Sequence, residues 1–213
     1  MRYKQIVFDI DGTLIDTEYA VLRSLQETLK TLCGESLPLE KLNFALGITG
    51  EDALKRFPIK DISSALDLWN KNMCKYSQNV TVFDGIPELL ERLAESGYKM
   101  GIVTSKTREE YENDFVPHKI HQYFSTVICA EDTSEHKPMP APLLKYMKLA
   151  GAGHNETLYV GDSKYDGMCA GKAGIDFALA AWGSHTQSIW ADYYLAKPLD
   201  LVKVVNEKDK NGE

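Results

Sequence analysis

Short runs of apolar residues, each ending at polar residues, alternate along most of this chain with longer stretches whose apolar residues recur at helical spacing. Runs of this length are typical of buried strands. Strands that alternate with helices indicate βαβ units, in which helices cover both faces of a parallel sheet. We therefore predict an α/β fold with a Rossmann-like parallel sheet, with strands at Tyr3–Asp9, Tyr98–Thr104, Thr126–Ala130, Thr157–Val160, Phe177–Ala181 and Tyr193–Ala196.

One stretch interrupts this alternation directly after the first strand. From residue 15 to residue 79 the pattern is helical almost throughout, with a long helix at Tyr19–Cys33 and a second that Asp61 is placed to cap. We expect residues 15–79 to form an inserted α-helical cap. Residues 1–14 and 80–206 would form the core, and the polar residues 207–213 a disordered tail.

Charge and composition narrow the class of protein. The chain has 213 residues and a formal net charge of −7, which argues against a nucleic-acid or anionic-membrane partner, because either needs a basic face. No apolar run approaches the roughly 18 residues of a membrane span, and the first ten residues do not resemble a signal peptide. The four cysteines form no CxxC pair, so we expect reduced, mostly buried thiols in a cytoplasmic protein.

Polar side chains follow four of the predicted strands at the point where each ends. Ligands bind beyond the carboxyl ends of the strands in an open parallel sheet, so these side chains are expected to converge there. They are Asp9 and Asp11 after the first strand, Thr104 and Ser105 after the second, Lys137 beyond the third, and Asp162 with Asp166 after the fourth.

Carboxylates gathered in this way would repel one another unless a cation lies among them. Oxygen ligands without thiolates suit a hard ion such as Mg²⁺, which often takes substrate phosphate as a further ligand. Phosphoryl transfer requires an in-line nucleophile, stabilisation of the equatorial oxygens and a proton for the leaving group. One aspartate can be the nucleophile, a second two residues on can be the general acid and base, and Thr104 and Lys137 can hold the phosphoryl group.

The same residues resemble the haloacid dehalogenase superfamily of phosphohydrolases, over nearly the whole chain. Its first motif, DxDGT, is matched by Asp9 to Thr13, and its second, a serine or threonine that ends a strand, by Thr104. The third, a lysine often followed by proline, is matched by Lys137, and the fourth by Gly161-Asp162 with Asp166. The helical insert resembles the cap of the phosphoglycolate phosphatase-like subgroup.

This resemblance implies roles for individual residues. Asp9 would be the nucleophile and Asp11 the acid and base, while Mg²⁺ would be held by Asp9, the backbone carbonyl of Asp11 and Asp162, with support from Asp166. The cap would close over the site and select substrates. Its turn Gly47-Ile48-Thr49 is a candidate selectivity loop, so that the substrate-binding residues would be Thr104, Ser105, Lys137 and Gly47.

Other interpretations of these residues are less favoured. An EF-hand fails on spacing, because Gly12 falls at the fourth position of a loop that needs glycine at the sixth. Lys106 is interpreted as a solvated side chain rather than a phosphate contact. The five histidines have no metal-ligand spacing and are interpreted as structural or surface residues.

The sequence thus predicts a Mg²⁺-dependent phosphatase that acts on a small phosphorylated metabolite, as a monomer or homodimer. A phosphomutase of the β-phosphoglucomutase type and a pyrophosphatase share the same core and stay open as alternatives. The mutases carry a histidine early in the first cap helix, where this chain has Val21. A dehalogenase would lack Asp11, and a non-catalytic module would not need the complete set of motifs.

Overall fold

The structure, a computed structural model, describes residues 2–34, 36–184 and 189–206, and a sheet of six parallel strands forms its centre. The strand order is β5-β4-β1-β6-β7-β8, so that β1 lies inside the sheet between β4 and β6. The α/β fold class predicted from the sequence is confirmed. The strands are β1 (Gln5–Phe8), β4 (Lys99–Val103), β5 (Phe124–Ile128), β6 (Thr157–Gly161), β7 (Asp176–Ala180) and β8 (Tyr193–Leu195).

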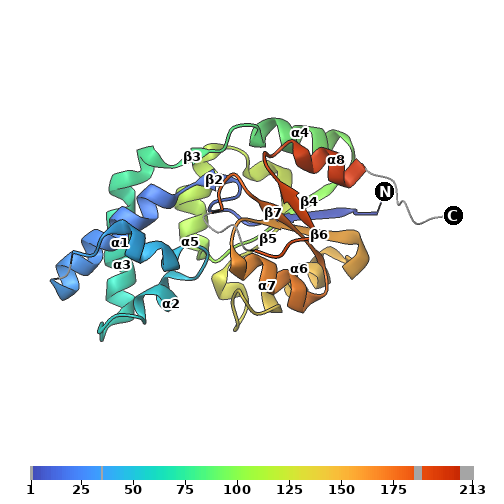
Figure 1. Ribbon diagram of the computed structural model, residues 1–213. Coiled ribbons are helices and arrows are strands. Elements are labelled where there is room, and N and C mark those ends of the chain that lie inside the picture. The colour runs from blue at the N-terminus through green and yellow to red at the C-terminus, as the bar shows by residue number, and fades with distance from the viewer. Residues whose placement is uncertain (1, 35, 185–188, 207–213) are drawn as a thin grey trace.

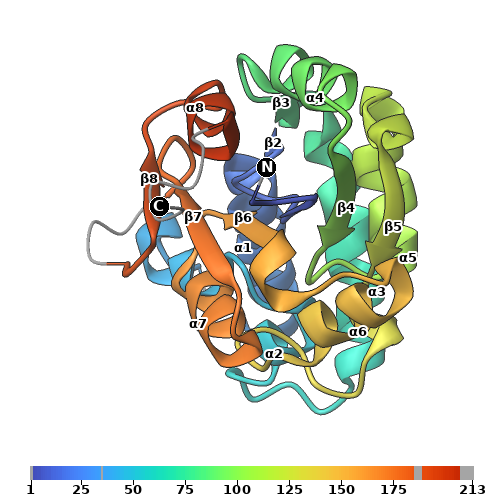
Figure 2. The same cartoon turned by 90° about the vertical axis from the view of Figure 1, so that its right-hand side faces the viewer.

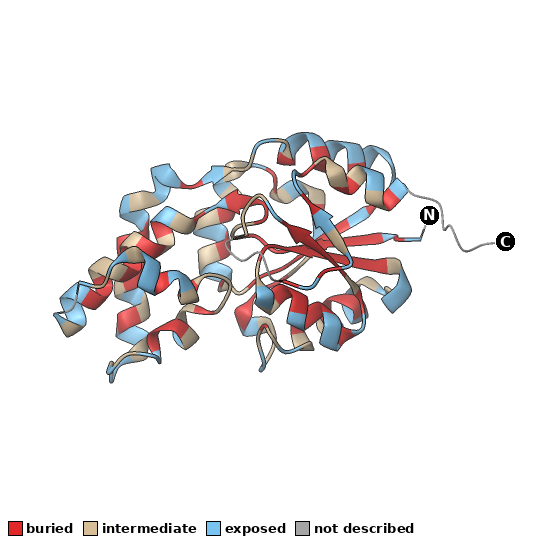
Figure 3. Cartoon of the chain, in the orientation of Figure 1, coloured by how far each residue is buried: buried red, intermediate tan, exposed pale blue. Residues whose placement is uncertain are grey.

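Helices cover both faces of the sheet because successive side chains of a strand point to opposite faces. In β1, Ile6 and Phe8 pack on one face and Val7 on the other. Figures 1 and 2 show the first face under α4 (Ile86–Glu95) and α8 (Asp200–Asn206), and the second under α6 (Ala141–Ala150) and α7 (Lys164–Ala173). Burial is concentrated in the strands and on the inward sides of these helices (Figure 3).

A separate group of helices lies at one end of the sheet and has an apolar core of its own. This helical segment, residues 17–80, contains α1 (Glu18–Cys33), α2 (Gly50–Leu54) and α3 (Ile62–Met73), with 3₁₀ turns at Leu39–Ala45 and Cys74–Asn79. Its core includes Leu25, Leu29, Leu54 and Trp69. The indole Nε1 of Trp69 donates to Ser24 Oγ at 2.8 Å, which joins α3 to α1. The helical segment therefore packs as a unit beside the sheet (Figure 1).

The chain leaves and re-enters the sheet region through a short antiparallel pair. Strand β2 (Ile15–Asp16) pairs with β3 (Thr81–Val82), so the two connections to the helical segment lie side by side. Residues 15 and 16 were predicted to be part of the helical stretch, and the structure places them in this pair instead. The predicted limits of core and cap stay a prediction.

Several local predictions differ from the structure. Strand β5 begins and ends two residues earlier than predicted, because Cys129 already caps a 3₁₀ turn at Ala130–Asp132. Helix α8 was not predicted at all. Of the four free cysteines, Cys129 and Cys169 are buried, whereas Cys33 is half-buried and Cys74 exposed. Asp61 caps α3 as predicted, and the tail 207–213 lies outside the described residues. Among the residues described, no helix has the length and apolar character needed to cross a bilayer.

Replacement of Gly101, in β4, by alanine tests how closely α6 packs on the sheet. An added Cβ would lie 2.0 Å from Cε2 of Tyr146 on α6, and the Tyr146 hydroxyl is anchored to Gln5 Oε1 at 2.9 Å. We expect Gly101→Ala to lower the free energy of unfolding by about 1–3 kcal/mol, the usual cost of overpacking. Urea denaturation measures the change.

The matched control is Gly171→Ala in α7, where an added Cβ would meet nothing within 4 Å. Alanine is favoured over glycine inside helices by roughly 0.5–1 kcal/mol, so this variant is expected to be as stable as the parent or more so. Equal stability of the two variants would contradict the close packing of Tyr146 against β4.

Candidate active site

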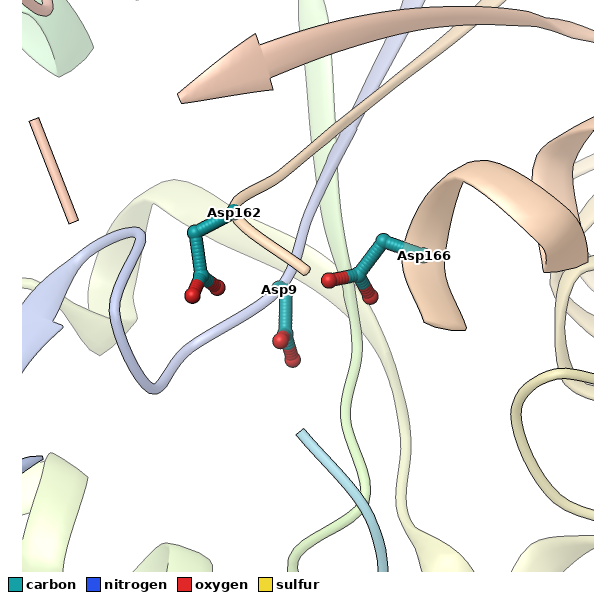
Figure 4. Close-up of side chains that lie close together, drawn as sticks. All are labelled: Asp9, Asp162 and Asp166. Atoms are coloured by element: carbon teal, nitrogen blue, oxygen red, sulfur yellow. The ribbon is translucent and has the colours of Figure 1, made fainter. Parts of the chain in front are cut away.

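Three aspartates meet beyond the carboxyl ends of β1 and β6. Asp9 directly follows β1, with its backbone N–H still bonded to Val160 O at 2.9 Å, and Asp162 directly follows β6. Asp166 comes from the first turn of α7. Figure 4 shows the three carboxylates facing a common space, and one oxygen from each lies within 4.8 Å of the others. All three residues are buried.

Two glycines allow this close approach. Gly12 has a φ of +74°, and a Cβ there would lie 2.4 Å from Asp162 Oδ2. A Cβ on Gly161 would lie 2.6 Å from Asp166 Cβ. Both positions belong to the sequence motifs, and both exclude a side chain because carboxylates already occupy the space.

Lys137 is the cation within this group. Its Nζ lies 2.9 Å from Asp9 Oδ2 and 2.8 Å from Asp166 Oδ1, and its side chain is 1% exposed. Burial lowers the pKa of Lys137, but Asp166 and Asp9 outweigh that effect and raise it above its ordinary value. Three carboxylates and one ammonium leave a charge of −2 when all are ionised, which a divalent cation would neutralise.

The surroundings of the Asp9 carboxylate favour a further positive charge beside it. Its Oδ1 is buried and has no hydrogen-bond partner among the residues that the structure describes. Burial raises the pKa of Asp9 to about 7, and the ammonium of Lys137 offsets only part of that effect. Burial also raises the pKa of Asp162 well above its ordinary value, with the Asp166 and Asp9 charges adding to it. Oxygen donors with an orphaned buried oxygen fit a hard divalent metal ion.

Asp166 is fully engaged with protein groups. Its Oδ1 accepts from Lys137 Nζ and from the Tyr159 hydroxyl, at 2.8 and 2.9 Å. Its Oδ2 accepts from the backbone N–H of Ser163 at 3.0 Å and from the Ser163 hydroxyl at 2.5 Å, while Ser163 Oγ in turn accepts from the Asp166 N–H to complete a capping box. Asp166 thus fixes both the position of Lys137 and the start of α7.

The second aspartate of the first motif faces away from this group. Asp11 Oδ1 accepts from Thr17 Oγ1 at 2.7 Å and lies 3.2 Å from Lys106 Nζ. Lys106 also pairs with Asp114 Oδ2 at 2.8 Å. Burial lowers the pKa of Lys106, but Asp11 and Asp114 outweigh that effect and raise it above its ordinary value.

The sequence-based interpretation of Lys106 was therefore wrong. Its side chain is 8% exposed, not solvated, because it lies between two carboxylates at the wall of the pocket. No local signal indicated this position, since its partner Asp114 is eight residues away on a π-helical turn at Tyr111–Phe115.

A pocket opens between the strand ends and the helical segment. Its wall includes Asp9, Asp11, Ser105, Gly47 and Asp162. Ser105 Oγ donates to the Gly47 carbonyl at 3.2 Å, which connects the core to the helical segment. Thr104 is buried behind this wall, and its Oγ1 accepts from the Lys106 N–H at 3.2 Å.

Sequence reasoning missed several residues of the wall, among them two that lie beyond β7. Trp182 and Gly183 follow β7 and line the pocket. The Trp182 indole donates to Thr13 O at 3.0 Å, and a Cβ on Gly183 would lie 1.8 Å from Gly12 O. Because they follow the end of a strand, their position in the sequence could have indicated that they belong to the site.

Comparison with known proteins agrees with this geometry. The family model for haloacid dehalogenase-like hydrolases matches residues 6–180. The chain belongs to this family. The resemblance noted from the sequence motifs is thereby confirmed at the level of the family, and the chain is a hydrolase of the haloacid dehalogenase-like type.

Relatives extend the match over the whole chain. A protein of Caldanaerobacter subterraneus provisionally named pyrophosphatase PpaX is 30% identical, over 99% of this chain and 98% of its own. Pyrophosphatase PpaX of Bacillus cereus is 27% identical over 99% of this chain and all of its own. A solved structure from Lactobacillus plantarum, provisionally named phosphoglycolate phosphatase, matches with a TM-score of 0.87 and 28% identity, over 96% of this chain and all of its own.

Removal of the Lys106 ammonium tests the buried arrangement around Asp11. Lys106→Met leaves Asp11 and Asp114 without their shared cation, so we expect the free energy of unfolding to fall by about 3–5 kcal/mol, the usual cost of breaking a buried pair. The control is Arg92→Met, which breaks an exposed pair with Glu88 and is expected to cost less than about 1 kcal/mol. Similar losses in denaturant titrations would show that Lys106 is not held as described.

Proposed function

We propose that this hydrolase is a Mg²⁺-dependent phosphatase, which cleaves the phosphate monoester of a small metabolite through an aspartyl-phosphate on Asp9. The observation that supports this most is the Asp9 carboxylate. It directly follows β1 at the wall of the pocket, contacts Lys137, and has one buried oxygen with no hydrogen-bond partner in the described part of the chain. A carboxylate that attacks phosphorus must be ionised and have one oxygen available.

In this proposal Asp9, Asp162 and the backbone carbonyl of Asp11 hold Mg²⁺. The ion would supply positive charge to the transferred phosphoryl group and to the ionised nucleophile. The protein contacts of Asp166 leave it a supporting part, in which it orients Lys137. Lys137 would stabilise the phosphoryl oxygens as a point charge. Ser105, which lines the pocket, would donate to them by turning its hydroxyl from the Gly47 carbonyl, and Thr104 would donate from its buried position beside Lys106.

Asp11 is the proposed general acid and base. It would protonate the leaving oxygen and afterwards remove a proton from the attacking water. Its two donors, Thr17 and Lys106, both contact Oδ1, so Oδ2 is the oxygen left to exchange the proton. Thr17 begins the helical segment, which the proposal treats as a cap that excludes water, with Gly47 at its contact with the core. A cytoplasmic monomer or homodimer is part of the same proposal.

The phosphomutase alternative finds less support in the pocket. Val21, which stands near the place where such mutases carry a histidine, does line the pocket. Its side chain cannot relay a proton. A pyrophosphatase is the second candidate, favoured by the names of the two PpaX relatives, which match over nearly the whole chain.

The decisive variant is Asp9→Asn. We expect it to fold and to release no phosphate from any member of a panel of phosphorylated metabolites, because an amide cannot form the covalent intermediate. Phosphate release with Mg²⁺ and trapping of acid-labile phosphate on the protein are the measurements. Turnover by the variant would refute Asp9 as the nucleophile.

Asp11→Asn serves as the companion variant and tests the general acid on both candidate classes of substrate. Loss of general acid catalysis typically costs 10²–10⁴-fold in rate, about what we expect for an alkyl phosphate. A phosphate leaving group is far less basic than an alkoxide, so it needs that proton far less. A small loss of rate on pyrophosphate, together with a large loss of rate on alkyl esters, would support Asp11 as the general acid, whichever class the natural substrate belongs to. Parental rates on alkyl esters would contradict it.

Binding of Mg²⁺ can be measured without substrate. We expect saturating Mg²⁺ to raise the melting temperature of the parent protein, because the ion binds the folded state and offsets the buried negative charge. Asp162→Asn should lose most of this shift, whereas Asp176→Asn, which alters a carboxylate at the opposite end of the sheet, should keep it. Equal shifts in all three proteins would rule out the proposed ligands.

A further inference from the structure

Many carboxylates and few cations line the pocket. Seven carboxylate residues line it, and among the described lining residues the single lysine or arginine is Lys106. The carboxylates belong to Asp9, Asp11, Asp16, Glu18, Glu110, Asp114 and Asp162.

Most of the available positive charge is already committed. Under the proposed function, Mg²⁺ and Lys137 together offset the three carboxylates of Asp9, Asp162 and Asp166. Lys106 is shared by Asp11 and Asp114, at 3.2 and 2.8 Å. Its ammonium therefore has two carboxylates to neutralise and no surplus charge for a ligand.

Two carboxylates that line the pocket, those of Asp16 and Glu110, have no ion pair with a lysine or arginine in the described part of the chain. Asp16 Oδ1 accepts the backbone N–H of Glu18 at 3.2 Å. Glu110 Oε2 accepts the backbone N–H of Thr107 at 2.8 Å. These hydrogen bonds hold both carboxylates at the pocket wall. Burial raises the pKa of Glu110 above its ordinary value, and the Lys106 ammonium offsets only part of that effect. This ammonium therefore has a third acidic neighbour, and a second anion would meet acidic groups at the wall.

The helical segment contributes apolar surface to the pocket instead of cations. Val21, Leu46, Ile48, Trp69 and Met73 line it from that side. No lysine or arginine of the helical segment does so among its described residues: Lys55 pairs with Glu51, for example, and Lys75 with Glu27.

We propose that the alcohol part of the substrate has an apolar body and carries no anionic group. This inference rests on the proposed function and narrows it: the Mg²⁺–Lys137 end takes the phosphate, and the wall around Trp69, Asp16 and Glu110 takes an uncharged or amine-bearing alcohol. Carboxylated phosphate esters and pyrophosphate, whose leaving groups are anions, are then poor substrates.

Two isosteric esters test this directly. Isobutyl phosphate and carboxymethyl phosphate have leaving groups of the same shape, one apolar and one a carboxylate. We expect kcat/KM to be at least about 10-fold higher for isobutyl phosphate, a ratio within the range that pocket contacts supply. The glycolate oxygen is intrinsically the better leaving group, so reactivity alone would favour the opposite order. A ratio of one or below overturns the proposal.

Variants locate the origin of the preference. Glu110→Gln removes a charge from the wall but keeps an acceptor for Thr107, and we expect it to raise relative activity on carboxymethyl phosphate several-fold. Asp16→Asn tests the other carboxylate in the same way. The matched control is Glu112→Gln, an exposed residue outside the pocket wall, which should leave the ratio unchanged. An unchanged ratio in both wall variants would contradict the assignment to these charges.

Binding separates failure of this inference from failure of the proposed function. If neither ester nor 4-nitrophenyl phosphate releases phosphate, the proposed function is wrong. The charge of the pocket can still be measured with isobutylphosphonate and phosphonoacetate, compared by their effect on the melting temperature in the presence of Mg²⁺. Stronger stabilisation by isobutylphosphonate supports the inference, and equal or stronger stabilisation by phosphonoacetate overturns it.

Discussion

The contact of one buried ammonium with two buried carboxylates is the constraint on which the site depends. Charges are costly to bury unless they are paired and hydrogen-bonded, and Lys137 meets that condition for Asp9 and Asp166 together. Asp166 in turn holds Ser163 and Tyr159. The ends of β1 and β6 and the first turn of α7 are thereby fixed to one another through polar contacts as well as through the sheet.

The same region joins the core to the helical segment. β2 pairs with β3 where the chain crosses between them, and Thr17, the first residue beyond, bonds to Asp11. A movement of the helical segment would therefore act on the side chain proposed as general acid. Lys106 ties that side chain to the core from the other side through Asp114, so the position of Asp11 depends on both parts of the molecule.

The positions of Asp9, Asp162 and Asp166 could be predicted because parallel strands end at the same edge of a sheet, whatever the details of packing. The role of Lys106 could not, since a lysine two residues after a strand is usually solvated. Its burial depends on Asp114, which the π-helical turn at Tyr111–Phe115 directs toward it. The residues next to Lys106 in the sequence do not indicate such a contact.

The sequence by itself determined the α/β fold, the helical interruption after the first strand and the meeting of acidic groups at one edge of the sheet. Each follows from periodicity or from the position of polar residues along one strand, which are local properties. Only the tertiary structure decided which cations are already neutralised, that Asp16 and Glu110 line the pocket, and that Trp69 and Trp182 face the same space. Those features depend on distances between segments far apart in the chain, and packing alone sets them.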